Sequence, residues 1–291
     1  MKSLFPLIAL LFVSASFAQR FDNVKIETTK LSDHVYMLVG AGGNIGVSVG
    51  DDGVFVIDDQ FAPLSEKILT AIKAISDKPL NFLVNTHWHG DHSGGNENMA
   101  NAGATIIAHD NVRIRMEKPR RDGSNNPKEA LPIITFNDKL NINVNDEAIA
   151  VFHVENAHTD GDAILYFTES NVLHTGDTYF KGKYPFIDLN SGGSASGYIE
   201  AAKRGLMVID DNTKIIPGHG APSNKAEYKA FLEMLEGLKA NISKAIAAGK
   251  TEEEVAKDTS LTKKYDDLGF DGGFINAERI RLTFYRSLKA E

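Results

Sequence analysis

Cysteine is absent from the 291-residue sequence. This excludes disulfide bonds, a thiolate nucleophile and thiolate metal ligands, so any chemistry must come from other side chains. Basic residues are also in deficit, with a formal net charge of −8 and an isoelectric point of about 5.6. Such a chain has no general excess of cations to neutralise phosphates, which argues against a nucleic-acid partner. The one basic run, residues 113–121, is interpreted as a solvated face of a helix and loop.

Long hydrophobic runs are absent as well. The N-terminal run, residues 4–13, is too short to span a bilayer, and no later run is long enough. It follows Lys2 and precedes the small residues Ser16 and Ala18, which is the three-part pattern of a secretory signal peptide cleaved after Ala18. A retained membrane anchor is the alternative. We therefore expect residues 1–18 to be a signal peptide and residues 19–291 to form a soluble exported domain. Its location would be periplasmic in a Gram-negative host, without membrane contact.

The remaining chain reads as an ordinary globular protein, 42% hydrophobic and 24% charged. Turn signals and apolar runs predict a β-meander, a strand–helix–strand unit and a second group of strands, with a helical C-terminal part over residues 224–291. The predicted strands are residues 35–38, 46–49, 54–57, 80–84, 104–108, 148–154, 163–167, 171–174 and 214–216. The predicted helices start after Pro63 and cover 96–101 and 198–209, and capping signals at Asn224/Glu227 and Thr251/Glu254 predict two more.

The densest polar cluster follows the predicted strand 80–84 directly, and its sequence is Asn85-Thr86-His87-Trp88-His89-Gly90-Asp91-His92. Neutral imidazole and carboxylate groups are ligands for zinc. In an extended segment, alternation points His87, His89 and Asp91 to one side, and His92 joins them if the chain turns. A solvated polar loop is the alternative.

Three further polar residues follow other predicted strands. They are His158 after strand 148–154, Asp177 after strand 171–174 and His219 after strand 214–216. Each is a weak signal alone. The carboxyl ends of strands in open α/β sheets are common ligand sites. The three residues together are therefore stronger evidence for such a site than any one of them.

The pattern His-x-His-x-Asp-His, with these later residues in order, resembles the metallo-β-lactamase superfamily over nearly all of the mature chain. The resemblance implies an α/β fold, a four-layered αββα sandwich with mixed sheets, and a site for two zinc ions per chain. The implied ligands are His87, His89 and His158 for one ion, Asp91, His92 and His219 for the other, and Asp177 as a bridge. Iron or manganese would fit the same residues.

The implied chemistry is metal-dependent hydrolysis. Two ions that share a water lower its pKa from about 15.7 to about 7, and the resulting hydroxide opens a cyclic amide or ester. Asp91 would orient the nucleophile and pass a proton to the leaving group. The partner is a small-molecule acyl substrate, and the oligomeric state stays open.

The substrate class depends on details of the resemblance. Class B1 β-lactamases have a cysteine where this chain has Asp177, and they lack a ligand like His92. The Gly-Asp-Thr-Tyr-Phe context of Asp177 is similar to glyoxalase II and to the lactonases. Export and length favour β-lactam hydrolysis, and with it antibiotic resistance, as the leading substrate prediction. A lactonase or thioesterase with side activity on β-lactams and a non-catalytic exported zinc-binding protein are the alternatives.

Rim residues would set specificity. Asn190 is the candidate for binding the substrate carbonyl, with a simple loop turn as the alternative, and Lys181 or Lys183 would bind a carboxylate. The predicted rims are residues 40–44, 60–63 and 181–193, and the aromatic candidates for the pocket or the core are Phe61, Trp88, Tyr179 and Phe186. His34, His109 and His153 have no cluster around them, and His174 is assigned either to strand packing or to support of Asp177.

Overall fold

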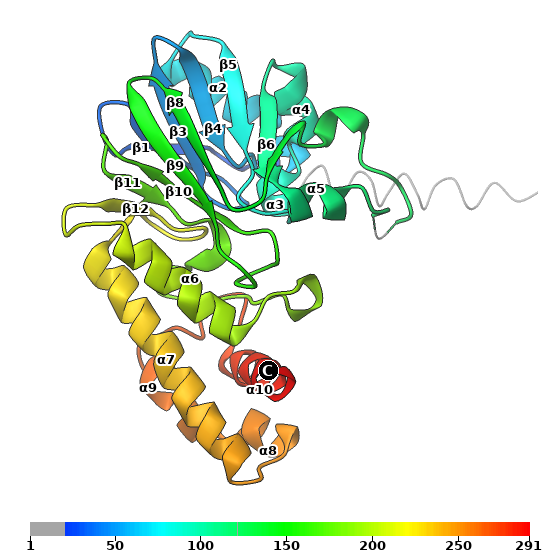
Figure 1. Ribbon diagram of the computed structural model, residues 1–291, viewed down its shortest axis with the longest axis vertical. Helices are drawn as coiled ribbons and strands as arrows, with labels where there is room; N and C mark the ends of the chain where they lie inside the picture. Colours follow the sequence, from blue (N-terminus) through cyan, green and yellow to red (C-terminus); the bar gives the residue numbers. More distant parts are fainter. Residues whose placement is uncertain (1–20, 121) are drawn as a thin grey trace, which may run out of the picture.

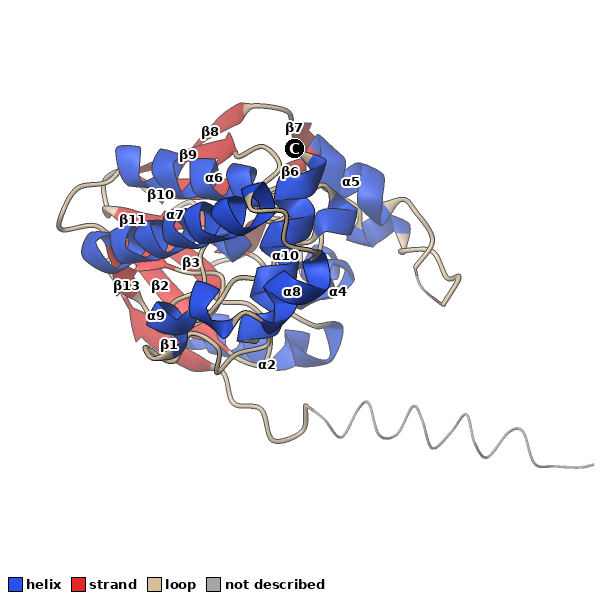
Figure 2. Ribbon diagram, turned by 90° about the horizontal axis from the view of Figure 1, so that it is seen from below, coloured by secondary structure: helices blue, strands red, loops and turns tan. Residues whose placement is uncertain are grey.

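The computed structural model describes residues 21–120 and 122–291, so the predicted signal peptide lies outside the described residues. Two mixed β-sheets stack face to face, and helices cover both outer faces (Figure 1, Figure 2). The first sheet has seven strands in chain order: β1 (Glu27–Lys30), β2 (Val35–Val39), β3 (Ile45–Gly50), β4 (Gly53–Ile57), β5 (Leu80–Val84), β6 (Thr105–His109) and β7 (Ile134–Phe136). Strands β1 to β4 are antiparallel, and β4 to β7 are parallel.

The second sheet has six strands in the order β13 (Ser223–Asn224), β12 (Lys214–Ile216), β11 (Val172–His174), β10 (Ala163–Phe167), β9 (Glu147–His153) and β8 (Lys139–Val144). Its pairs are antiparallel except β11 and β12, which run parallel. The two sheets are also joined at the site, where the backbone N–H of Ala163 donates to the carbonyl of Thr86 at 2.8 Å.

Alternation along the strands divides the core into layers. In β4, Phe55 and Ile57 face the core between the sheets, whereas Val54 and Val56 face the helices on the outer side. Helices α2 (Ser65–Ile75) and α4 (Asn96–Asn101) cover this outer side. Helix α5 (Asp110–Met116) packs at the end of β6 over a small cluster of its own.

Helices from the second half of the chain lie on the outer side of the second sheet (Figure 1, Figure 2). Helices α6 (Ala195–Met207) and α7 (Lys225–Ala247) lie next to the sheet, and α10 (Ala277–Ala290) packs against both of them. Helix α8 (Glu252–Lys257) packs against α10, and α9 (Lys263–Asp266) is a short helix of the same side. The order helix, sheet, sheet, helix confirms the predicted four-layered αββα sandwich. Among the described residues, no helix combines the length and the apolar character that crossing a membrane requires.

Candidate metal centre

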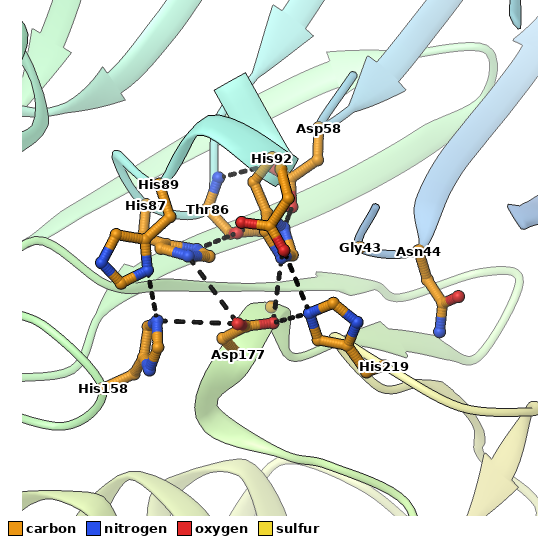
Figure 3. Close-up of polar contacts among 12 residues, drawn as sticks. Gly43, Asn44, Asp58, Thr86, His87, His89, His92, His158, Asp177 and His219 are labelled. Atoms are coloured by element: carbon orange, nitrogen blue, oxygen red, sulfur yellow. Dashed lines mark hydrogen bonds and ion pairs between the residues drawn. The ribbon is translucent and has the colours of Figure 1, made fainter. Parts of the chain in front are cut away.

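All seven predicted ligands meet at one edge of the two sheets, although they come from four separate segments (Figure 3). His87 and its neighbours follow β5, and His158 lies between β9 and β10. Asp177 lies in the short 3-10 helix η3 (Gly176–Thr178) after β11, and His219 follows β12. The parallel pair β11 and β12 ends at the same edge, which explains why Asp177 and His219 lie close together.

The segment after β5 turns earlier than the sequence predicts. Strand β5 ends at Val84, a bend follows at residues 86–88, and helix α3 (Gly90–Ser93) begins directly after His89. Asp91 therefore reaches the site from a helical turn, not by strand alternation with His87 and His89. The turn also brings in His92.

The ligand atoms form two groups around Asp177 (Figure 3). Its Oδ2 lies 3.9 Å from His87 Nε2 and 3.6 Å from His158 Nε2. Its Oδ1 lies 3.0 Å from His92 Nε2 and 3.3 Å from His219 Nε2. One carboxylate oxygen thus faces each group, which is the arrangement expected of a bridging ligand.

The outer members complete the two groups. His89 Nδ1 lies 2.8 Å from His158 Nε2 in the first group. In the second group, Asp91 Oδ2 lies 3.4 Å from His219 Nε2 and 3.8 Å from His92 Nε2. The first group is nearly closed to solvent, whereas Asp91 and His219 are about one third exposed, at 30% and 34%.

At the centre, Nε2 of His87, Nε2 of His92 and Oδ1 of Asp177 are buried and make no hydrogen bond, although the last two lie 3.0 Å apart. Buried polar groups are nearly always satisfied in folded proteins, so these atoms are expected to bind a further partner. Imidazole nitrogens and carboxylate oxygens suit divalent metal ions, and the residues present fit a metal pair.

Protonation differs between the two groups. Burial lowers the pKa of His158 to about 4 and that of His87 well below its usual value, so both imidazoles are neutral and free to donate a lone pair. Burial also opposes charge on His92 and His219. The nearby carboxylates, Asp177 foremost, outweigh it and raise the pKa of His219 to about 9 and that of His92 well above its usual value. The second group therefore favours a positive charge, which a metal cation would supply.

Three residues behind the ligands fix the orientation of the rings. Asp58 Oδ2 accepts from His92 Nδ1 at 2.7 Å, the carbonyl of Phe186 accepts from His158 Nδ1 at 2.7 Å, and Asp188 Oδ2 accepts from His89 Nε2 at 3.1 Å. Each bond leaves the other ring nitrogen facing the centre, as is usual for histidines that bind metals.

Asp58 also holds the backbone next to the predicted ligands. It accepts from the backbone N–H of Thr86 at 2.7 Å and from its hydroxyl at 2.8 Å. Asp58 is not among the residues predicted from the sequence, although it directly follows β4 and thus has the same strand-end position as the predicted ligands. Asp188 lay within a predicted rim without an assigned role.

The glycine loop 40–44 packs behind the second group. A Cβ on Gly43 would lie 2.0 Å from the ring of His92, so only glycine lets this ring pack against the backbone. The side-chain amide of Asn44 donates to the carbonyls of Pro217 and Gly220, both at 2.8 Å. The loop thus holds His92 from one side and the segment with His219 from the other (Figure 3).

A cavity of about 540 Å³ opens onto the ligands. It is lined by His89, Gly90, Asp91, Asp177 and His219 together with Phe61, Phe180, Lys183, Tyr184, Phe186, Phe274 and Ile275. Of the predicted aromatic candidates, Phe61 and Phe186 line it. Tyr179 is a core residue whose hydroxyl meets Ser223, and Trp88 packs beside the cluster under α5.

Two predicted substrate-binding residues are not brought to this cavity. Asn190 lies in the 3-10 turn η4 (Leu189–Ser191) with an exposed side chain, and its backbone N–H is capped by Asp188. Lys181 is engaged by Glu227 at 2.9 Å and by the carbonyl of Pro222 at 2.8 Å. Lys183, by contrast, lines the cavity.

The other histidines lie outside the two groups. His174 is buried, accepts from the backbone N–H of Gly176 at 3.1 Å, and so supports the turn with Asp177. His109 and His153 stack on each other with centroids 3.8 Å apart, and His34 is exposed.

Comparisons with known proteins identify a family and a fold for this chain. A family model described as the metallo-beta-lactamase superfamily matches residues 38–242. The alpha subunit of a 2,4-dinitroanisole O-demethylase from Nocardioides sp. is 24% identical over 204 residues, which are 69% of this chain and 59% of that protein. A hydroxyacylglutathione hydrolase from Pelagibacter ubique is 29% identical over 163 residues, 54% of this chain and 59% of that protein.

Among solved structures, a metallo-beta-lactamase from Pontibacter korlensis matches with a TM-score of 0.62 at 19% identity. The match covers 73% of this chain and 99% of that one, and at this identity it shows the fold alone. The chain spans about half to three fifths of the length of the first curated relatives that it matches.

Proposed function

Because the chain belongs to the metallo-β-lactamase superfamily, whose members are metal-dependent hydrolases, we propose that it is a dinuclear zinc hydrolase of small acyl substrates. The observation that supports this most is the position of Asp177, whose two oxygens each face one group of imidazoles. His87, His89 and His158 would hold one zinc ion, Asp91, His92 and His219 the other, and Asp177 both.

Bound zinc ions would lower the pKa of a water to near neutrality and polarise the substrate carbonyl. The chain's own residues orient the reaction. Asp91 is partly exposed toward the cavity, and although burial opposes its charge, His92 and His219 lower its pKa. It is thus an ionised carboxylate, able to accept a proton and return it to the leaving group.

Esters and thioesters are the substrates that the site favours. Asp177 takes the place of the cysteine of B1 β-lactamases, and the hydroxyacylglutathione hydrolase relative acts on a thioester by its name. Asn190, the residue proposed to bind a β-lactam carbonyl, is exposed and outside the cavity.

β-Lactam hydrolysis is the second candidate, and Lys183 favours it. This lysine lines the cavity, where it could bind the carboxylate of a β-lactam. We also propose export to the periplasm, on the pattern of residues 1–18.

The test is hydrolysis by the mature, zinc-loaded chain of three substrates: a γ-lactone, a hydroxyacyl thioester and a chromogenic cephalosporin. We expect chelator-sensitive turnover of the lactone or thioester, with a kcat of about 1–10³ s⁻¹, and slower turnover of the cephalosporin. Fastest turnover of the cephalosporin would support the second candidate instead.

Variants link the turnover to the metal centre. His219→Ala should lose at least about a hundredfold in kcat/KM, and His34→Ala, at an exposed histidine outside the site, should lose nothing. Two bound metals without turnover of any of the three substrates would contradict a hydrolase and favour a zinc-binding protein.

A further inference from the structure

One wall of the cavity comes from a part of the chain beyond the family match. Phe274 and Ile275 line the cavity, yet they lie in the segment between α9 and α10, past residue 242 where the match ends. These two residues thus lie outside the part of the chain that the family model matches.

Residues 266–276, which include Phe274 and Ile275, are fixed to the cavity rim at residues 183–186 by several contacts. The backbone N–H of Tyr184 donates to the carbonyl of Phe270 at 3.0 Å, and the Tyr184 hydroxyl donates to Asp266 at 2.7 Å. Lys183 Nζ reaches the carbonyl of Gly269 at 3.4 Å. These bonds hold residues 266–276 against residues 183–186 of the cavity rim.

Phe274 is held in place but is not covered by the protein. Its ring meets Phe186 edge to face, with centroids 5.9 Å apart and an interplanar angle of 88°. The guanidinium of Arg279 lies 4.6 Å from the Phe274 centroid and 5.7 Å from the Phe186 centroid. Phe274 nevertheless is 74% exposed. A large apolar side chain that is fixed at the mouth of a cavity and left exposed indicates a surface that a ligand covers.

The cavity wall joins the ligands to an aromatic surface. Phe186 stacks on His89 with centroids 5.9 Å apart and meets Phe274 on its other side, so an apolar surface runs from the ligands to Phe274. A substrate that lies along this surface would place its acyl carbonyl at the ligands and an apolar group against the aromatic side chains.

We propose that the segment 266–276 forms a binding site for an aryl or similarly bulky apolar group of the acyl substrate, with Phe274 as its main specificity-determining residue. This inference rests on the proposed hydrolase function. It limits the substrates to amphiphilic acyl compounds, in which a lactone or thioester carries an apolar substituent.

The test compares two lactones that differ only in one substituent, phenyl in one and methyl in the other. Wild-type protein should prefer the phenyl compound in kcat/KM by about tenfold or more, the size of effect expected of a filled apolar pocket. Phe274→Ala should lose most of this preference, mainly through a higher KM for the phenyl compound.

Leu268→Ala is the matched control. Leu268 is also a large apolar residue of the same segment, 67% exposed, and it does not line the cavity. It should leave the phenyl-to-methyl ratio unchanged. An unchanged ratio in Phe274→Ala, or an equal loss in both variants, would overturn the inference.

A binding experiment separates this inference from the proposed function. Calorimetric titration of zinc-loaded protein with 4-phenylbutyrate and with butyrate needs no turnover. Tighter binding of the phenyl compound that Phe274→Ala reduces at least about fivefold would support the apolar site even if no lactone is hydrolysed. Hydrolysis without a phenyl preference, or no phenyl-dependent binding, would overturn it.

Discussion

Single side chains outside the ligand set decide how the ligands are presented, and Asp58 is the main one. Its carboxylate accepts from His92 and twice from Thr86. Asp58→Asn removes the charge that orients and polarises His92, so we expect a loss of about 10–100-fold in affinity at the group Asp91, His92 and His219. Competition with a chromophoric chelator measures it.

The neighbouring carboxylate provides the control. Asp59 is fully buried and accepts from the backbone N–H of Gly95, and burial raises its pKa well above the usual value. Burial thus favours its neutral form, and Asp59→Asn keeps the shape of the side chain. Equal losses of metal affinity in the two variants would show that Asp58 has no specific role.

The position of Gly43 gives a steric prediction. A methyl group there would meet the ring of His92 at 2.0 Å, closer than any real contact. We expect Gly43→Ala to displace this ring and to lower the bound metal from about two ions per chain to about one. Elemental analysis of the dialysed protein measures the ratio.

Gly90→Ala is the control for Gly43→Ala. Gly90 also adjoins two ligands, yet a Cβ on it would meet nothing within 4 Å. This variant should retain both metal ions. If Gly43→Ala retains them too, the close packing of loop and ring is not needed for binding.

The protonation states of the histidines predict that metal affinity depends on pH differently in the two groups. His219, with a pKa of about 9, and His92, with a raised pKa, hold protons at pH 7 in the metal-free chain, so metal binding there must displace them. The affinity of this group should rise about tenfold or more for each pH unit from 6 to 8. Because His158 has a pKa of about 4, the first group should change little over the same range.

Chelator titrations at several pH values test this difference. Two distinct affinities should converge as the pH approaches 9. If both metal affinities changed with pH in parallel, the proposal that only the group of Asp91, His92 and His219 holds protons at pH 7 would be wrong.

The grouping of the predicted ligands could be foreseen from the sequence, whereas the contacts of their supports could not. His87, His89 and Asp91 are marked by residue type and close spacing, and Asp58 is marked only by its place at the end of β4. The roles of Asp58 and Asn44 come from contacts with partners 34 and 173 positions away, which no local pattern contains.

At the scale of elements, the segment between β12 and β13 depends on the glycine loop. Asn44 is buried and donates to the carbonyls of Pro217 and Gly220, and its backbone N–H donates to Gly218. Asn44→Ala leaves two carbonyls without their donor, which should cost about 1–3 kcal/mol in the free energy of unfolding. Urea denaturation measures this loss, and kcat should fall with it because His219 lies in the segment.

Asn98→Ala is the control at this scale. Asn98 of α4 is partly buried, and its amide donates to Ala62 and Ser65, outside the segment with His219. Asn98→Ala should lower the free energy of unfolding by about 0.5–1.5 kcal/mol, the range of an ordinary hydrogen bond. A smaller loss for Asn44→Ala than for Asn98→Ala would contradict the role of the loop.

Elements with a strong apolar signal were predicted, and those without it were missed. The strand predicted at 80–84 matches β5, and the helix predicted at 96–101 matches α4. All four residues of β1 are exposed, so no apolar pattern marked this edge strand. Strand β8 is an exception, because Leu140, Ile142 and Val144 alternate along it and yet the sequence prediction does not include it.

At the scale of the whole molecule, the candidate metal centre joins the two sheets. His87, His89 and His92 come from the half of the chain that builds the first sheet. His158, Asp177 and His219 come from the half that builds the second. The order of the layers followed from the resemblance. The part of the cavity wall that residues 266–276 form could not be predicted from the resemblance, because it depends on how a C-terminal loop packs against the rim.

A metal pair that joins both halves should stabilise the whole fold. Since the ions bind the folded chain far better than the unfolded one, free zinc at 1,000 times its dissociation constant should add about 4 kcal/mol to the free energy of unfolding. Urea denaturation with zinc and with a chelator measures the increment. Asp177→Asn, which weakens the bridge between both groups, should reduce the increment strongly, whereas His34→Ala should leave it intact. An increment that is equal in all three proteins would mean that zinc acts elsewhere on the chain.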